Sequence, residues 1–493
     1  MKNVLDFFMK QFIVFILMLF PLIAFTQITV DTSFEGANAR VLSVDNTNNV
    51  IKVESVLKRG DTRNVVFFFR VSGIDSTRTF KIRVQFSQSY YPPVYAVYSY
   101  DRITWYRILG TISGNYKEYS GIFNRRTIYF SHGYPYVYSD LIALQNRLAA
   151  SPFVNVSNVS YSESGRAVKL FRITNPSVSD SGKSLVWVLG RNHVMESNSN
   201  YVVEGLIDYL VSSDAGAERL RNQAIVYLVP VMDVDMVFVG GTGKDQLPVD
   251  FNRDWDSPSY WNAVRDVKTK MLQTAASNRM RIFIDSHDPF PGETDTTGRL
   301  FFYSMQSAGV KFQNLNKFRT MLFNAGGYYW GRKLLYPTSG QTSSKWADSV
   351  FTNIDFSASL ETGWIQRTDN ALWSLPLYRL NGAVLGKGIS EYINQSTSIN
   401  GNEMPVRFSV DVFPNPFNGK VIFRISLEKI SVVKIKIYDV LGNNLAAVDF
   451  GKISANSHDF IFDASYFSSG IYFYEINAGN NYPLKKGKLV LIK

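Results

Sequence analysis

Two histidines and a glutamate have the residue types and the placement expected of a metal site. His193 and Glu196 stand three residues apart in GRNHVMES, shortly after the hydrophobic run SLVWVLG. His287 ends a second such run, MRIFIDSH. Two imidazoles and one carboxylate form the ligand set of a catalytic zinc site that leaves one position open for water. The competing interpretation is that His193 and Glu196 are polar residues at the start of an ordinary helix, where the helix dipole favours an acid.

Three further motifs carry groups that a hydrolytic site needs. In VDFNRDW, Asn252 stands beside Arg253, and an amide next to a guanidinium suits capture of a carboxylate. In FSASLETGW, Glu361 ends an apolar run, where partial burial raises a carboxyl pKa toward that of a general base. In VPVMDVDMV, Asp233 and Asp235 follow another apolar run, and one of them is a candidate for orienting a zinc-bound imidazole. Taken singly, the Asn252–Arg253 pair more often marks a surface turn with an ordinary salt bridge, and a glutamate placed as Glu361 is more often a strand end that faces solvent.

The chain predicts three folded regions that position these groups. Residues 27–128 contain short strand-like runs between turns, which favours an N-terminal β-sandwich. From 129 to 395, apolar strands alternate with helical patterns, which predicts a central α/β domain whose mixed sheet has a largely parallel core. Because ligands collect at the carboxyl ends of parallel strands, both histidines are expected at one sheet edge. A polar linker at 396–410 precedes a smaller C-terminal β-sandwich at 411–493.

Composition narrows the class of protein. The 493 residues are too many for one core, and 45 % hydrophobic with 19 % charged residues exclude disordered and fibrous classes. There is no cysteine, so thiolate zinc ligands and cysteine nucleophiles are excluded. The formal charge of +11 comes from scattered Lys and Arg residues, and no basic run carries a nucleic-acid-recognition motif. We therefore expect a solvated basic surface and no nucleic-acid partner.

The N-terminus predicts export. Residues 1–26 have a Lys-bearing start, an apolar run and small residues near the end, as in a secretory signal peptide cut before Gln27. The alternative is an N-terminal membrane anchor. No later segment has the roughly 18 uninterrupted apolar residues of a spanning helix, so we expect no transmembrane segment in the mature chain.

In order along the chain, GRNHVMES, VPVMDVDMV, VDFNRDW, FIDSHD and SLETGW resemble the motifs of the zinc carboxypeptidase family, and more closely its cytosolic-carboxypeptidase-like branch. The resemblance implies one zinc ion per chain, held by His193, Glu196 and His287, with Glu361 as the catalytic base. Upstream, RTIYFSHGYPYVYSDL and SYDRITWYRI resemble that branch's joining segment and N-terminal β-sandwich. His132 is therefore expected to be structural.

The same resemblance assigns the substrate-binding groups. It implies that Arg253, with Asn252, binds the terminal carboxylate of a peptide. The aromatic residue that closes over the substrate is expected to be Tyr336, with Tyr328 and Tyr329 as alternatives.

Two positions depart from the family pattern. The Asn-Pro-Asp-Gly turn is here Asp233-Val234-Asp235-Met236, which loses the turn-forming residues but keeps the acid at Asp235, expected behind a zinc ligand. The arginine that polarises the scissile carbonyl is replaced near Gly243, where Lys244 is expected to stabilise the oxyanion as a point charge.

The tail has its own resemblance. VFPNPFNGKVIFRISL, IKIYDVLGNNL and FSSGIYFYEI resemble the C-terminal sorting domain of type IX secretion. This implies recognition by that machinery, passage through the periplasm of a Gram-negative bacterium, and a secreted or surface-attached product. The alternative is an ordinary carbohydrate-binding sandwich. His458 lies in this tail and is not expected to be catalytic.

These observations predict a secreted zinc carboxypeptidase that acts on peptide or protein C-termini. Two alternatives stay open: an amidase acting on cell-wall peptides or other amides, and a surface binding protein without turnover. Side-chain preference depends on loops between His287 and Glu361, where Lys333 and Lys345 either favour acidic termini or face water.

Overall fold

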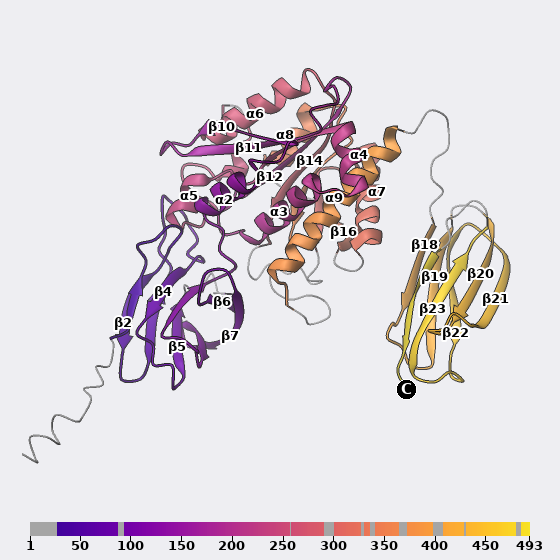
Figure 1. Ribbon diagram of the computed structural model, residues 1–493, viewed down its shortest axis with the longest axis horizontal. Helices are drawn as coiled ribbons and strands as arrows, with labels where there is room; N and C mark the ends of the chain where they lie inside the picture. Colours follow the sequence, from indigo (N-terminus) through magenta and orange to yellow (C-terminus); the bar gives the residue numbers. More distant parts are fainter. Residues whose placement is uncertain are drawn as a thin grey trace, which may run out of the picture. The chain divides into compact units, whose positions relative to one another are not determined.

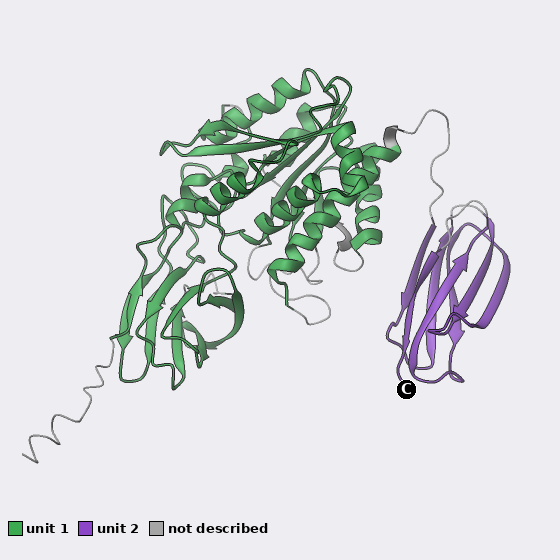
Figure 2. Ribbon diagram, in the orientation of Figure 1, with its two compact units in different colours: residues 1–398 green, residues 399–493 purple. Residues whose placement is uncertain are grey.

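The computed structural model describes residues 27–86, 93–256, 258–289, 300–326, 330–335, 341–363, 372–397, 408–427, 430–479 and 485–493. The chain divides into two compact units, residues 1–398 and 399–493, drawn in green and purple in Figure 2.

The N-terminal part of the first unit is a nine-stranded sheet in the order β1-β4-β9-β6-β7-β8-β5-β3-β2. Its strands are β1 (Thr29–Asp31), β2 (Arg40–Asp45), β3 (Val50–Glu54), β4 (Phe68–Ser72), β5 (Phe80–Gln85), β6 (Tyr95–Ser99), β7 (Trp105–Ser113), β8 (Tyr116–Gly121) and β9 (Thr127–Ser131). The first half of β7 pairs with β6 and its second half with β8, so this strand joins the two halves of the sheet. Residues from both halves, among them Ile51, Ile82, Phe69 and Phe130, bury their side chains in one core. The expected N-terminal β-rich region is confirmed, and its last strand, β9, ends at Ser131.

The rest of the first unit is an α/β domain. Its elements are α2 (Tyr138–Leu148), β10 (Val154–Tyr161), β11 (Ala167–Ile173), β12 (Ser184–Gly190), α3 (Asn198–Val211), α4 (Ala215–Gln223), β13 (Ala224–Val229), α5 (Val234–Val239), the short 3₁₀ helix η1 (Phe251–Arg253), α6 (Asn262–Ala275), β14 (Met280–His287), β15 (Leu300–Ser304), α7 (Gly309–Gly326), β16 (Trp330–Leu335), α8 (Ser343–Val350), β17 (Phe356–Glu361) and α9 (Leu375–Thr397).

The central sheet has the order β10-β11-β13-β12-β14-β17-β15-β16 and is mixed, as expected. Its middle strands β13, β12, β14 and β17 are mutually parallel. β12 and β13 are rich in Val, Ile and Leu, and all four strands are almost entirely buried, because helices cover both faces of the sheet. Helices α3, α4 and α7 pack with α9, and α6 and α8 lie together, bridged by a contact between Lys268 and Trp346 (Figure 1). The parallel core gives the sheet one edge at which several strand carboxyl ends meet.

The second unit consists of a three-stranded and a four-stranded sheet, ordered β18-β19-β22 and β21-β20-β23-β24. The strands are β18 (Phe408–Phe413), β19 (Lys420–Leu427), β20 (Ser431–Tyr438), β21 (Asn444–Ile453), β22 (Asn456–Asp463), β23 (Gly470–Asn477) and β24 (Lys485–Leu491). Apolar residues alternate along β19 and β20, and those of both sheets form a common core that includes Phe423 and Ile435. Across the described ranges of both units, no helix has the length and apolarity needed to span a membrane.

Candidate active site

The sheet topology brings the predicted chemical groups to one edge. β12 and β14 are parallel neighbours, with Gly190 paired to Ser286, so His193 follows the end of one strand and His287 ends the next. β17 is the parallel neighbour on the other side of β14, and its last residue, Glu361, is directly opposite His287. Residues separated by up to 168 positions in the sequence are therefore adjacent at the carboxyl ends of three neighbouring strands.

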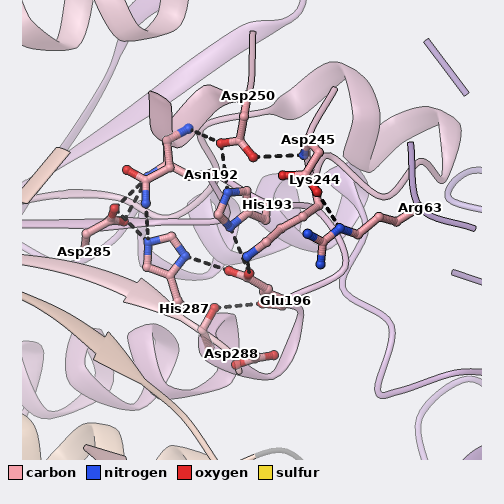
Figure 3. Close-up of polar contacts among 12 residues, drawn as sticks. Arg63, Asn192, His193, Glu196, Lys244, Asp245, Asp250, Asp285, His287 and Asp288 are labelled. Carbon is pink, nitrogen blue, oxygen red and sulfur yellow. Dashed lines mark hydrogen bonds and ion pairs between the residues drawn. The ribbon is translucent and has the colours of Figure 1, made fainter. Parts of the chain in front are cut away.

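His193, Glu196 and His287 form a compact, buried group (Figure 3). The Nδ1 atom of His193 lies 2.8 Å from Glu196 Oε1, and the Nδ1 atom of His287 lies 2.7 Å from Glu196 Oε2. One ligand atom from each residue can be chosen so that all three lie within 4.8 Å of one another. The three residues are between 1 % and 3 % exposed. This donor set, two imidazole nitrogens and a carboxylate converging from separate elements, fits a zinc ion.

A carboxylate stands behind each imidazole and orients its ring. The outer Nε2 atom of His193 lies 3.0 Å from Asp250 Oδ1, and that of His287 lies 2.8 Å from Asp285 Oδ2. Asp285 is itself held by Asn192, whose Nδ2 lies 2.9 and 3.0 Å from its two oxygens. Such partners fix the ring orientation and increase the basicity of the opposite nitrogen. In both histidines that nitrogen is Nδ1, which faces the centre of the group.

Asp235 does not have the predicted role. Its carboxylate accepts from Ser162 Oγ at 2.9 Å and from Arg166 Nη1 at 2.8 Å, and it pairs with Arg59 Nη1 at 3.0 Å. The prediction that Asp235 orients a zinc-bound imidazole is therefore wrong, because these three partners fix its carboxylate in an ionic cluster and Asp250 takes the position behind His193.

The sequence does contain signals for the two correct acids. Asp285 precedes His287 by two residues on β14, and residues two apart in a strand point to the same face. Asp250 stands two residues before Asn252 in VDFNRDW, within the motif already singled out. Its Oδ1 accepts the Asn252 backbone N–H at 2.7 Å, which links the ring support of His193 to the start of η1.

The three ligands have strongly perturbed electrostatics. Burial lowers the pKa of each histidine, but the carboxylates around them outweigh it, Asp250 first for His193 and Asp285 first for His287, so both pKa values are raised. Burial raises the pKa of Glu196, but the opposing effects of His193, Lys244 and His287 hold it well below its usual range. The site therefore concentrates positive partners around an ionised carboxylate.

Glu361 has the opposite perturbation. Burial, reinforced by the nearby Glu196 and Asp288 carboxylates and opposed by His287, raises its pKa to about 8. Its Oε2 is buried and accepts no hydrogen bond from the described residues. A carboxyl group with a high proton affinity and an unused oxygen, held beside a metal ligand, has the properties of a general base.

Lys244 lies inside the site. Its Nζ is 3.4 Å from Glu196 Oε1, and its side chain is 18 % exposed. The preceding Gly243 has a φ of +65°, and a Cβ on it would lie 2.6 Å from the backbone nitrogen of Val194, next to His193. Glycine is required at this position because only it accepts both the left-handed backbone and the close approach.

The N-terminal sheet region supports both loops of the site. Asp61 accepts the backbone N–H groups of Thr242 and Gly243 at 2.6 and 2.9 Å, which fixes the segment leading to Lys244. His132 is buried between Phe67 O at 3.3 Å and Met195 O at 3.4 Å, and burial lowers its pKa to about 4. The position of His132, away from the ligand group and between two backbone carbonyls, agrees with a structural role.

The predicted substrate-binding residues have different environments. Asn252 is buried, with Nδ2 3.0 Å from His287 Nε2 and Oδ1 accepting the Ser343 backbone N–H at 2.9 Å. Arg253 is exposed and donates one bond, from Nη1 to the Asn252 carbonyl at 2.9 Å. Tyr336, Tyr328 and Tyr329 lie outside the described residues. His458 lies in the second unit on an exposed strand, where its Nε2 contacts the carbonyl of a neighbouring turn at 3.0 Å.

Comparison with known families agrees with this geometry. Residues 141–290 match the zinc carboxypeptidase family, and residues 411–491 match the secretion system C-terminal sorting domain. The first range includes the three metal-ligand candidates, and the second spans the strands of the second unit.

Curated relatives match part of the chain. Cytosolic carboxypeptidase 2 of Homo sapiens is 31 % identical over 178 residues, which cover 34 % of this chain and 19 % of that protein. Cytosolic carboxypeptidase 6 of Caenorhabditis elegans is 29 % identical over 167 residues, which cover 32 % of this chain and 36 % of that protein. The chain thus spans between a fifth and just over a third of these relatives.

Solved structures share the fold over a longer range. A metallo-carboxypeptidase from Pseudomonas aeruginosa, in complex with (2-guanidinoethylmercapto)succinic acid, superposes with a TM-score of 0.66 and 21 % identity, covering 74 % of this chain and 99 % of that one. A metallo-carboxypeptidase from Burkholderia cenocepacia gives a TM-score of 0.65 at 18 % identity, covering 75 % and 100 %. One chain therefore contains a match to the zinc carboxypeptidase family at residues 141–290 and a match to the secretion system C-terminal sorting domain at residues 411–491, and it shares the fold of these metallo-carboxypeptidases.

Proposed function

We propose that the protein is an exported, zinc-dependent carboxypeptidase that removes residues from the C-termini of peptides or proteins. The observation that carries the proposal is the placement of Glu361 Oε2. It is buried, without a hydrogen-bond donor among the described residues, and held opposite His287 at the edge where the three ligand candidates converge. A site that had only a structural metal would not need such a group.

The ligand residues define what a metal would contribute. His193, Glu196 and His287 would hold one zinc ion, which supplies Lewis acidity that polarises a carbonyl group and acidifies water. Asp250 and Asp285 hold both imidazoles so that Nδ1 faces Glu196, where the ion would be bound. This support from outside the ligand group fixes the geometry before substrate arrives.

Glu361 performs the proton transfers. Its Oε2 takes a proton from the attacking water and then delivers it to the nitrogen of the departing amine. The pKa of about 8 in the metal-free site gives the Glu361 carboxylate a higher affinity for that proton than an ordinary glutamate has. Lys244 lies against Glu196 and provides the nearby positive charge for the oxyanion that develops on the carbonyl oxygen.

Arg253 determines which end of the substrate peptide is cleaved. Arg253 belongs to η1 and is exposed, and the residue before it, Asn252, contacts His287. A guanidinium pairs well with a carboxylate through two parallel hydrogen bonds. Binding the terminal carboxylate there places the last peptide bond, and no internal one, at the catalytic group.

The C-terminal unit indicates where in the cell or outside it the protein is found. A C-terminal sorting domain supports export by the type IX machinery of a Gram-negative bacterium, and we propose a secreted or cell-surface-attached product after removal of the tail. The signal peptide at residues 1–26, which lie outside the described residues, is the predicted first step of that route.

A second candidate function is an amidase that acts on cell-wall peptides or other amides. Two observations favour it: the Asn252 amide is engaged by His287 and Ser343, and Lys244 stands where the family has an arginine. The first leaves the Asn252 amide less available to a terminal carboxylate, and the second replaces the arginine fork that would polarise the scissile carbonyl. A binding protein without turnover is the weakest reading, because it gives no reason for the buried Glu361.

The two enzymatic readings differ in their need for a free carboxylate. The test compares zinc-loaded protein acting on matched peptides that end in a free carboxylate or in a carboxamide. We expect at least a hundredfold preference for the free terminus, and we expect Arg253→Ala to remove most of it by raising KM. Arg219→Ala, an exposed arginine on α4, is the matched control. Equal hydrolysis of both peptides would establish the amidase instead.

A further inference from the structure

The segment that carries Lys244 is rich in glycine. Residues 240–244 read Gly-Gly-Thr-Gly-Lys and follow the end of α5. Gly240 and Gly243 have positive φ values of 76° and 65°. Glycine loses more conformational freedom on folding than any other residue, so this segment needs contacts from outside itself to hold one conformation.

Asp61 of the N-terminal region supplies the central contact. It lies in the loop between β3 and β4 and is 4 % exposed. Its two carboxylate oxygens accept the consecutive backbone N–H groups of Thr242 and Gly243, Oδ2 at 2.6 Å and Oδ1 at 2.9 Å. Successive N–H groups that point to one side of the backbone form a small anion-binding concavity. The Asp61 carboxylate fills it and fixes the backbone immediately before Lys244.

Arg63 of the same loop attaches the segment on both sides of Lys244. Its carbonyl oxygen accepts from Thr242 Oγ1 at 2.6 Å, two residues before the lysine. Its guanidinium pairs with the carboxylate of Asp245, the residue directly after the lysine (Figure 3). The N-terminal region therefore holds the backbone that leads to Lys244 and the side chain that follows it.

On its other side, the segment contacts the loop of the metal-ligand candidates. The Met195 backbone N–H, one residue before Glu196, donates to the Thr242 carbonyl at 2.9 Å. Lys244 Nζ lies 3.4 Å from Glu196 Oε1. Thr242 thus donates to Asp61 through its N–H and accepts from the ligand loop through its carbonyl. A shift of this backbone would move the Lys244 ammonium relative to Glu196.

We propose that Asp61 is a positioning residue for the hydrolytic reaction and that it acts through Lys244. The inference rests on the proposed function, which gives Lys244 the task of stabilising the oxyanion. Asp61 bonds the backbone, whereas the charge that meets the substrate belongs to Lys244. A misplacement of about 1 Å, caused by a change away from the reacting atoms, can reduce a rate about 100-fold. The N-terminal region is therefore part of the catalytic arrangement.

The chemistry of Asp61 shows which substitution tests this role. Burial raises its pKa to about 6, although its N–H bonds and Arg59 oppose the rise. Asparagine has the same shape but replaces one acceptor oxygen with an NH₂ group. Asp61→Asn therefore keeps one of the two backbone bonds and sets a donor against the other N–H. The segment is expected to loosen while the protein remains folded.

The first test is a double-mutant cycle in the full-length, zinc-loaded protein, with a peptide that has a free C-terminus as substrate. Lys244→Ala is expected to reduce kcat about 100- to 1000-fold, the usual effect of removing an oxyanion donor. Asp61→Asn is expected to reduce kcat about 10- to 100-fold and to leave KM within about twofold. In the Lys244→Ala background, Asp61→Asn is expected to change kcat by less than about twofold, because no ammonium is left to position.

Asp101→Asn is the matched control. Asp101 belongs to the same region, and its Oδ1 accepts the Ile103 and Thr104 backbone N–H groups at 2.8 Å each, in the turn between β6 and β7. This variant is expected to leave kcat unchanged. If Asp61→Asn fails to fold, Thr242→Val removes only the Oγ1 bond and is expected to lower kcat through Lys244 in the same way. Equal losses with and without Lys244 would show a general structural role and overturn the proposal.

A second test needs no turnover, which separates this inference from the proposed function. Lysines of the full-length protein are acetylated with N-hydroxysuccinimidyl acetate, with and without zinc, and their labelling rates are measured by mass spectrometry. Asp61→Asn is expected to raise the rate at Lys244 about tenfold, because local opening exposes the ammonium, and to leave the exposed Lys387 unchanged. A zinc-bound wild type that cleaves no peptide would refute the proposed function. An unchanged rate at Lys244 would overturn the positioning role, whatever the activity.

Discussion

Replacing Glu361 by Gln tests two properties of this carboxyl group: the destabilisation of the folded protein that its raised pKa implies, and its contribution to catalysis. The raised pKa means that the folded, metal-free protein binds a proton at Glu361 more tightly than the unfolded chain does. Between the ordinary value of 4.5 and about 8, folding therefore becomes less favourable as pH rises, and below the ordinary value the two states do not differ at this group. Glutamine is neutral and of the same shape, so Glu361→Gln removes this dependence.

The size of the effect follows from the shift. Each pKa unit corresponds to about 1.4 kcal/mol, so a shift from 4.5 to about 8 amounts to about 5 kcal/mol above pH 8, about 3 kcal/mol at pH 7 and under about 1 kcal/mol at pH 5. Glu361 retains partial solvent exposure, which makes these upper values. Urea unfolding of zinc-stripped protein at pH 5, 7 and 9 measures the difference between variant and wild type.

The same variant tests catalysis. Zinc-loaded Glu361→Gln is expected to keep its metal and to lose about 10²- to 10⁴-fold in kcat, the usual contribution of a general base. Glu218→Gln, an exposed acid on α4, is the matched control for both experiments. A stability difference between Glu361→Gln and wild type that stays constant from pH 5 to 9 would refute the electrostatic reasoning, and full activity in the variant would remove Glu361 from the base role.

Three further predictions concern the metal. His193→Ala is expected to lose both zinc and activity, because it removes a ligand rather than the base; metal analysis of the purified protein checks this. Asp250→Asn is expected to weaken zinc binding about 10- to 100-fold by releasing the His193 ring, whereas Asp235→Asn leaves the affinity unchanged; chelator competition compares the two. Because carboxylates raise the pKa values of both His193 and His287, protons compete with the metal up to higher pH, so apparent zinc affinity is expected to fall as pH is lowered from 8.5 to 5.5. An affinity that is flat over this range would mean that the rings are already neutral.

The candidate metal ligands could be predicted from the sequence because histidines are few and two of them follow apolar runs. With four histidines in 493 residues, few pairs are possible, and two of the four follow apolar runs that read as buried parallel strands. Parallel strands share a carboxyl-terminal edge, so the order of elements alone predicts that His193 and His287 approach each other. Glu361 was found in the same way, as the end of a third such strand.

The carboxylates that orient the two histidine rings, Asp250 and Asp285, could not be identified from the order of the strands. Asp235, in the first turn of α5, and Asp250, before η1, each follow a valine, and this local pattern does not show which of the two reaches His193. The choice is made by Arg59 and Arg166, which come from distant segments and hold Asp235 in an ionic cluster, while the turn at η1 places Asp250 against His193. The predicted aromatic lid at Tyr336 stays a prediction, since it lies outside the described residues.

The sequence by itself determined which residue types stand at the ends of which strands, and with them the candidate metal ligands and the proposed base. These features are encoded locally, by hydrophobic runs and the polar residues that end them. Only the tertiary structure decided which carboxylate supports each candidate ligand and why Gly243 is needed beside Val194. Those features depend on contacts between segments far apart in the chain, and their energies arise from burial and charge pairing that exist only once the segments have packed together.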